Sequence, residues 1–294
     1  MKIEKNCRII AVTVTPFDEK GNANIDEIIA QTEELCNSEA DAILPCASTG
    51  EFVKMDLPER AEILRAVAKQ NKGRKKLIAG ACDTCAKRVL DSVKVAKECG
   101  YDAAIVCPPY YYGLSQDDVL AFYREVCEGA GDMPIIAYHV PFFTTGIEIP
   151  TYRKLLEIPN LVGLKDSSAN MKRISHLCNI AKLERPDFAV FTGTDDCLFP
   201  ALCAGCHGSM TALGASMPAE IRAIYDAFDA RDIETAMCRQ QAILPIIREA
   251  DAFAFPIGYK LLAKACGSGT KESFGDAENV AADKMVSMLK EIRR

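Results

Sequence analysis

The stretch Leu161–Asn170, LVGLKDSSAN, holds a short apolar run that ends at a lysine, just where small polar residues begin. The run does not alternate between polar and apolar residues, which indicates a strand buried on both faces. Lys165 would then stand at the carboxyl end of that strand. A surface lysine rarely has such a position, whereas a lysine that must attack a carbonyl needs one.

The same pattern recurs along the chain, because short apolar runs alternate with segments whose apolar residues have helical spacing. The eight predicted strands are Ile9–Val14, Ala42–Pro45, Leu77–Ala81, Ala103–Cys107, Pro134–Tyr138, Leu161–Lys165, Ala189–Thr192 and Gly208–Leu213. The predicted helices include Ile25–Cys36, Pro58–Gln70, Thr84–Gly100 and Ser115–Glu128, then Pro218–Ala230, Ile233–Ala250, Ala254–Cys266 and Ala281–Arg293.

Eight strand–helix units in succession predict an α/β fold, the (β/α)8 or TIM barrel, followed by a C-terminal helical extension. We assign residues 1–225 to the catalytic barrel and residues 226–294 to the extension. A doubly wound sheet is the alternative. It is disfavoured because no G-x-G-x-x-G follows the first strand, where Val14–Phe17 opens into a loop instead.

The composition and charge of the chain exclude some classes of function. The chain has 294 residues, 49% of them hydrophobic, and a formal net charge of −6. This balance is typical of a globular protein and argues against nucleic acid or an anionic membrane as partner. No stretch of about 18 apolar residues predicts a membrane span. The N-terminus shows no secretory pattern, so we expect a cytoplasmic protein.

The fourteen cysteines are interpreted as reduced, buried thiols rather than as a disulfide framework. Two C-x-x-C spacings, Cys82/Cys85 and Cys203/Cys206, could suggest zinc. More than a hundred residues separate the two pairs, however, and the chain has only three histidines. We therefore expect no metal.

In a TIM barrel, functional residues gather at the carboxyl ends of the strands. There the sequence places hydroxyls, phenols and Lys165, a set that suits imine chemistry on a 2-oxo acid without a metal cofactor. The Ser48–Thr49–Gly50 turn offers hydroxyls and backbone N–H groups to a substrate carboxylate. Tyr138 can carry protons. His139 is expected against or just behind the substrate.

At these positions the chain resembles the class I aldolases and lyases typified by dihydrodipicolinate synthase and N-acetylneuraminate lyase. The resemblance spans nearly the whole chain. The motifs that carry it are STGE (Ser48–Glu51), PPYYY (Pro108–Tyr112), YHVP (Tyr138–Pro141), GLKDSS (Gly163–Ser168) and GTDD (Gly193–Asp196).

The resemblance implies a role for each matching residue. Lys165 would form the Schiff base with pyruvate or another 2-oxo acid, and Tyr138 would relay protons with Ser48. Tyr111 would complete the site of a neighbouring subunit, since family members are usually homotetramers built as dimers of dimers. The residues expected to bind substrate are Thr49, Gly50, Met210, Gly193, Asp195, Asp196, His139, Phe143 and Ser167.

Departures from the family pattern bear on the substrate. Dihydrodipicolinate synthases carry an arginine shortly after the tyrosine motif, but here Phe142 and Phe143 follow and no arginine occurs before Arg153. Loss of a bidentate carboxylate partner argues against that activity. The acidic pair after the seventh strand matches the sialic acid lyases, whereas the two phenylalanines make the mouth of the pocket more apolar than a sugar usually requires.

The sequence therefore predicts a Schiff-base lyase that releases or uses pyruvate, acting on a 2-oxo-3-deoxy sugar acid or an N-acetylneuraminate-like substrate. One alternative is dihydrodipicolinate synthase. Another, from a different class, is a non-catalytic sensor of oxo acids, although a sensor could dispense with Lys165.

Overall fold

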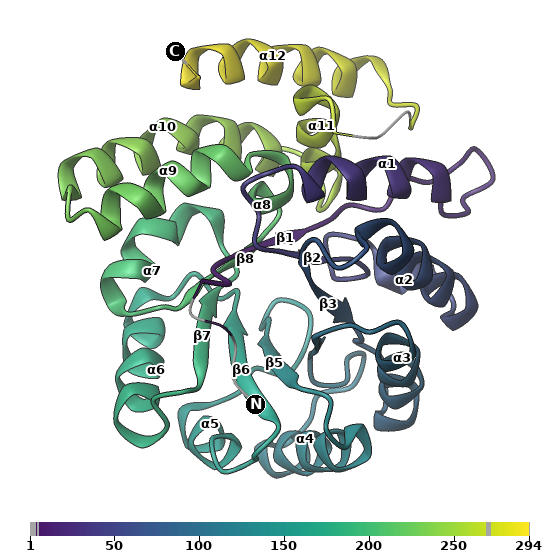
Figure 1. Cartoon of the computed structure of the whole chain (residues 1–294), viewed down its shortest axis with the longest axis vertical. Helices are drawn as coiled ribbons and strands as arrows, with labels where there is room; N and C mark the ends of the chain where they lie inside the picture. Colours follow the sequence, from purple (N-terminus) through teal and green to yellow (C-terminus); the bar gives the residue numbers. More distant parts are fainter. Residues whose placement is uncertain (1–3, 5, 269–271, 294) are drawn as a thin grey trace.

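The computed structural model describes residues 4, 6–268 and 272–293. Eight parallel strands close into a barrel in which each strand pairs with the next and β8 pairs with β1 (Figure 1). The predicted TIM barrel is therefore confirmed. The strands are β1 (Ile9–Val12), β2 (Ala42–Leu44), β3 (Lys76–Gly80), β4 (Ala103–Val106), β5 (Ile135–His139), β6 (Leu161–Asp166), β7 (Ala189–Thr192) and β8 (Gly208–Thr211).

Helices surround the barrel, and polar side chains cap several of their N-termini. Asn24, Asp56, Ser115 and Asn170 each accept a hydrogen bond from a backbone N–H of the first turn, which satisfies a donor that the helix itself leaves unpaired. The surrounding helices are α1 (Ile25–Cys36), α2 (Leu57–Asn71), α3 (Ala86–Glu98), α4 (Gln116–Ala130), α5 (Ile149–Leu155), α6 (Met171–Glu184), α7 (Leu198–Ala204) and α8 (Leu213–Ser216).

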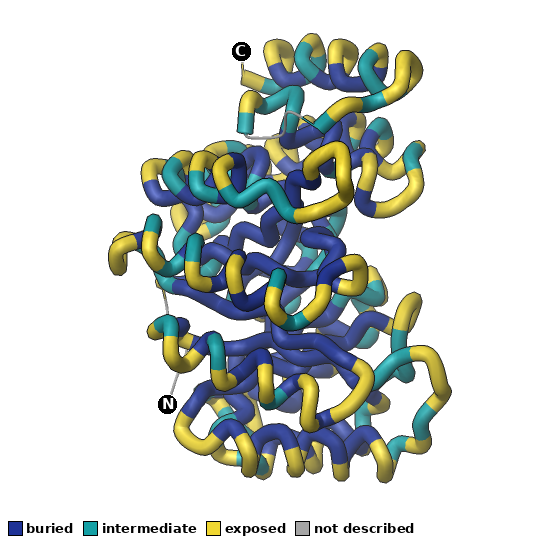
Figure 2. Tube along the Cα trace, turned by 90° about the vertical axis from the view of Figure 1, so that its right-hand side faces the viewer, coloured by how far each residue is buried: buried dark blue, intermediate teal, exposed yellow. Residues whose placement is uncertain are grey.

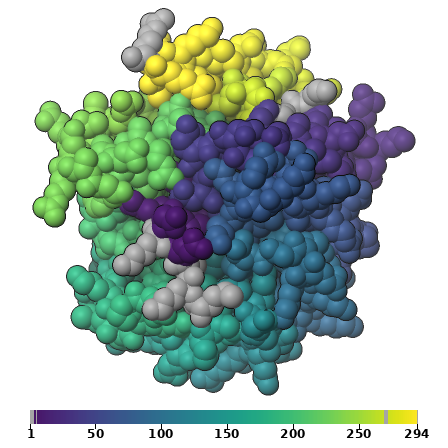
Figure 3. All heavy atoms as spheres, in the orientation of Figure 1, coloured from purple at the N-terminus to yellow at the C-terminus, as the bar shows by residue number. Residues whose placement is uncertain are grey.

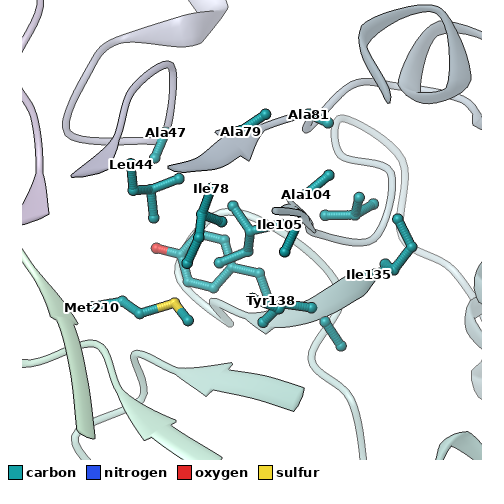
Figure 4. Close-up of a cluster of buried hydrophobic side chains, with 14 of the residues drawn as sticks. Leu44, Ala47, Ile78, Ala79, Ala81, Ala104, Ile105, Ile135, Tyr138 and Met210 are labelled. Atoms are coloured by element: carbon teal, nitrogen blue, oxygen red, sulfur yellow. The ribbon is translucent and has the colours of Figure 1, made fainter. Parts of the chain in front are cut away.

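The barrel interior is a packed apolar core. Almost every strand residue is buried, while the helices bury one face and expose the other (Figure 2). Figure 4 shows the inward side chains near the carboxyl ends of the strands, where Leu44, Ile78, Ile105 and Met210 surround Tyr138. The Tyr138 hydroxyl therefore projects among apolar side chains near this end of the barrel.

Beyond β8 the chain is helical, as predicted. The extension contains α9 (Pro218–Asp229), α10 (Ile233–Asp251), α11 (Ile257–Cys266) and α12 (Asp276–Ile292), which lie at one end of the molecule (Figure 3). These helices form a second apolar cluster with α7 and α8. Residue 225, our boundary between barrel and extension, lies within α9, and the division stays a prediction. No helix in the described part of the chain is long and apolar enough to cross a bilayer.

The extension also contacts the loops at the carboxyl ends of the strands. Gln240 of α10 donates to the backbone oxygen of Asp195 at 3.0 Å, and its own side-chain oxygen accepts from the Phe199 backbone N–H at 2.9 Å. Lys260 of α11 reaches Glu51 in the loop after β2. The C-terminal helices thus help to position the loops that carry the predicted site.

Candidate active site

Lys165 and Tyr138 lie side by side in the barrel. They are register partners in the β5–β6 pair, and each side chain is only 4% exposed. The Lys165 amine lies 4.4 Å from the centre of the Tyr138 ring. Parallel pairing at the carboxyl ends of two adjacent strands therefore brings together the predicted nucleophile and the predicted proton carrier.

Ser167 and Gly193 complete this group. The Ser167 hydroxyl lies 3.5 Å from the Tyr138 hydroxyl and 3.5 Å from the Gly193 carbonyl oxygen. The Gly193 backbone N–H donates to the Asp166 carbonyl oxygen at 2.7 Å, which joins the ends of β6 and β7. Three neighbouring strand ends thus meet around the Lys165 amine.

Gly193→Ala should lower kcat/KM roughly a hundredfold, because small displacements of reacting groups have effects of that size. An added Cβ would lie 2.0 Å from the Ser167 hydroxyl and 2.6 Å from Lys165 Cε, so the lysine would have to move. Steady-state kinetics check this prediction. Gly113→Ala is the matched control, because its Cβ would meet nothing within 4 Å. Equal activity of the two variants would contradict the proposed role of this contact.

The Ser48–Glu51 turn follows β2 and contains the predicted carboxylate donors. The Glu51 backbone N–H donates to the Ser48 carbonyl oxygen at 3.0 Å and closes the turn. Within the described residues, the N–H groups of Thr49 and Gly50 donate to no protein group. Two such amides in one turn suit the carboxylate predicted to bind here, and that role stays a prediction.

Gly50 fits closely into its surroundings. A Cβ there would lie 3.1 Å from the Thr13 carbonyl oxygen, and the Gly50 carbonyl oxygen accepts from the Thr15 hydroxyl at 2.7 Å. The loop after β1 therefore supports the turn after β2. Sequence reasoning did not single out Thr15, although it stands in the VTPF stretch that marked the end of the first strand.

His139 is buried at the end of β5, directly after Tyr138. Its Nδ1 accepts from the Ile147 backbone N–H at 2.9 Å, so the ring supports the loop between β5 and α5. Its Nε2 lies 4.0 Å from Asp166, which accepts from Arg173 at 2.8 Å. Burial lowers the pKa of His139 to about 4, with Asp166 opposing the shift and Arg173 adding to it. His139 is therefore neutral at pH 7, and its role in substrate binding stays a prediction.

Asp195 and Asp196 have different environments. Asp196 accepts from Arg248 through both carboxylate oxygens, at 2.6 and 2.8 Å, on the outside of the loop. Asp195 is buried, and burial raises its pKa to about 7, although the Thr211 hydroxyl and the Leu213 backbone N–H oppose the shift. Of the two carboxylates predicted to bind substrate, Asp196 is thus held in an ion pair with Arg248, while Asp195 lies in the protein interior.

Asp195→Asn should stabilise the protein increasingly as pH rises. The unfolded carboxyl group ionises near its usual pKa, whereas the folded one resists ionisation until about pH 7. The wild type therefore loses stability from about pH 4 to about pH 7. Relative to the variant, it should lose roughly 3 kcal/mol between pH 5 and pH 8. Urea denaturation at several pH values measures this difference.

Asp196→Asn is the control for the pH experiment, because it removes only a partly exposed ion pair with Arg248. Such a pair contributes up to about 1 kcal/mol. A difference between Asp195→Asn and wild type that stays flat with pH would show that the Asp195 carboxylate is not buried as described.

The remaining predicted residues have contrasting positions. Met210 is fully buried in β8 and projects into the barrel interior near Tyr138 (Figure 4). Phe143 is 56% exposed at the rim, with its ring centre 6.0 Å from that of Phe255. Tyr111 is 87% exposed, and its ring centre lies 4.9 Å from that of the neighbouring Tyr112. Its predicted role in another subunit's site stays a prediction.

The cysteines are all free thiols. Of the two C-x-x-C pairs, Cys82 and Cys206 are buried while Cys85 and Cys203 are exposed. In the part of the chain that the structure describes, no three histidine, cysteine or carboxylate side chains are arranged to hold a metal.

The profile of the Dihydrodipicolinate synthetase family matches residues 5–292. The chain belongs to this family. The chain is 32% identical over 267 residues to an uncharacterized DapA-like lyase from Thermofilum pendens, covering 90% of this chain and 88% of that protein. It is 28% identical to a 2-dehydro-3-deoxy-D-gluconate/2-dehydro-3-deoxy-phosphogluconate aldolase from Picrophilus torridus, covering 84% of this chain and 90% of the aldolase.

Among solved structures, DHDPS from Cyanidioschyzon merolae with lysine bound has the same fold, with a TM-score of 0.89. It is 24% identical, and the alignment covers 98% of this chain and 99% of that one. The resemblance predicted from the motifs is therefore confirmed. Members of this family are class I aldolases and lyases, so this protein is an aldolase or lyase of that class.

Proposed function

We propose that this enzyme cleaves a 2-oxo-3-deoxy sugar acid to pyruvate and an aldehyde through an imine on Lys165. The observation that carries the proposal is the position of Lys165, buried at the carboxyl end of β6 with its amine 4.4 Å from the Tyr138 ring. The arrangement supports nucleophilic attack by Lys165 on the keto carbon of a bound 2-oxo acid.

The chemistry follows from these groups. The amine adds to the keto carbon, water leaves, and a protonated imine forms. Tyr138 removes the proton of the C4 hydroxyl, the C3–C4 bond breaks, and its electrons move to the imine as an enamine while the aldehyde departs. Protonation at C3 and hydrolysis then release pyruvate. Ser48 would assist the proton transfers, and Thr49 and Gly50 would hold the carboxylate.

Several features favour a short sugar acid over an N-acetylneuraminate-like substrate. Asp196 is bound to Arg248, and Asp195 is buried, so neither carboxylate is free to receive a long polyhydroxy chain. Phe143 and Phe255, whose ring centres lie 6.0 Å apart, add apolar surface after β5, which suits a long polyhydroxy chain poorly. The aldolase relative from Picrophilus torridus is named for six-carbon acids of this kind.

Dihydrodipicolinate synthase is the less favoured activity. The loop after β5 contains no arginine, and Arg153, the first one that follows, pairs with Glu184 at 3.1 Å on the outside of the barrel. Its guanidinium therefore cannot form a bidentate pair with a second substrate carboxylate at the mouth of the site.

We retain two further proposals on the strength of the family pattern alone. The first is a homotetramer in which the exposed Tyr111 reaches the site of a neighbouring subunit. The second is a cytoplasmic location. We propose neither nucleic acid nor a membrane as a partner of this protein.

The experiment that tests the function measures pyruvate release, coupled to lactate dehydrogenase, across a panel of 2-oxo-3-deoxy sugar acids and N-acetylneuraminate. We expect release from a six-carbon acid and little from N-acetylneuraminate. Pyruvate consumption with aspartate semialdehyde, and no release from any sugar acid, would instead identify a synthase. Binding of pyruvate without a borohydride-trapped adduct would identify a sensor.

A further inference from the structure

The extension contributes a buried cation to the neighbourhood of the site. Lys260 of α11 is only 3% exposed, and its amine lies 2.6 Å from Glu51 and 2.8 Å from Glu272. It also lies 4.6 Å from the centre of the Phe17 ring. Burial of a lysine is unfavourable unless its charge is paired, so this position requires its carboxylate partners.

Glu51 is the last residue of the Ser48–Glu51 turn. It has a left-handed backbone conformation, with φ of 54°, which a residue with a side chain rarely adopts. Its side chain is nearly buried and pairs with Lys54 as well as with Lys260. A buried ion pair therefore fixes the residue whose N–H closes the turn.

The turn is the proposed carboxylate site, and it contains the free N–H groups of Thr49 and Gly50. A shift of Glu51 would move the hydrogen bond between Glu51 and Ser48 and reorient both amides. We infer that Lys260 is a positioning residue, which sets the affinity of the site for the substrate carboxylate by holding Glu51. The inference rests on the proposed function and extends it to the C-terminal helices.

Lys260→Met tests the inference, because methionine occupies similar space without the charge. The readout is the pyruvate concentration that gives half-maximal trapping by borohydride, followed by intact mass. We expect this concentration to rise roughly 10- to 100-fold, as is typical when binding groups are misplaced. Trapping at saturating pyruvate should remain complete, and kcat should change far less than KM, which a general loss of folding would not produce.

Lys264→Met is the matched control. Lys264 stands one turn further along α11, its amine lies 2.8 Å from Asn279 and it also lies over a phenylalanine ring, that of Phe274. If the half-saturating pyruvate concentration rises no more in Lys260→Met than in Lys264→Met, the inference is wrong. Thermal melting of both variants separates this effect from instability.

Glu51→Gln provides a second route, should Lys260→Met fail to fold. It keeps the shape of Glu51 and removes the charge that faces Lys260, so the half-saturating concentration should rise in the same direction. A folded Glu51→Gln variant with wild-type affinity for pyruvate would overturn this inference but leave the proposed function standing. Absence of trapping in the wild type would overturn the proposed function and this inference with it.

Discussion

Lys165→Ala should abolish pyruvate release, with a loss in kcat/KM of at least about 10³-fold, because the proposed mechanism uses an imine on this lysine as the electron acceptor for the bond cleavage. The same substitution should abolish the adduct that borohydride traps with pyruvate. Mass spectrometry of the intact protein, followed by peptide mapping, measures the adduct and its position. Since Lys165 is buried at a strand end, circular dichroism should verify that the variant folds.

Lys172→Ala is the control for this experiment. Lys172 lies on the exposed side of α6, seven residues after Lys165. Its substitution should leave both the adduct and the turnover unchanged. A Lys165→Ala variant that still forms one adduct per chain would place the imine on another lysine.

Tyr138→Phe should lower kcat by roughly 10²- to 10⁴-fold, the usual range for loss of a positioned proton donor or acceptor. The ring stays in place, because it is 4% exposed in the apolar layer that Figure 4 shows. Only the hydroxyl is lost, and it lies 3.5 Å from the Ser167 hydroxyl. Borohydride trapping after long incubation with pyruvate should therefore persist while steady-state turnover falls.

Tyr101→Phe separates catalysis from packing. Tyr101 is also buried, and its hydroxyl donates to the Leu64 carbonyl oxygen at 3.1 Å. Its loss should cost about 1 kcal/mol of stability and leave kcat nearly unchanged. Similar rates for the two phenylalanine variants would show that the Tyr138 hydroxyl carries no proton in the slow step.

The strands were predictable because each is buried on both faces and therefore forms a continuous apolar run. All eight predicted runs overlap strands, although β1 ends at Val12 and β8 at Thr211, each two residues before the predicted end, and α1 has the predicted bounds. The last helix begins at Asp276 rather than at the predicted Ala281, because its first turn is polar and lacks the apolar spacing that guided the prediction. Helix ends depend on local capping, which periodicity does not record.

The central site could be predicted for the same reason. Once the strands were known, the carboxyl ends of β5, β6 and β7 had to meet, so Tyr138, Lys165 and Gly193 could be expected together. Thr15 and Lys260 could not be expected there from their local sequence. The support that they give to the Ser48–Glu51 turn depends on contacts between residues far apart in the chain.

The sequence by itself determined the barrel and the family and predicted the nucleophile, since these follow from apolar runs and from the residues that end them. Only the tertiary structure decided the environment of each polar group. Adjacent residues Asp195 and Asp196 have the same chemistry, yet one is buried and the other binds Arg248. Burial and charge pairing are set by what the fold brings near a side chain, and those neighbours come from distant parts of the chain.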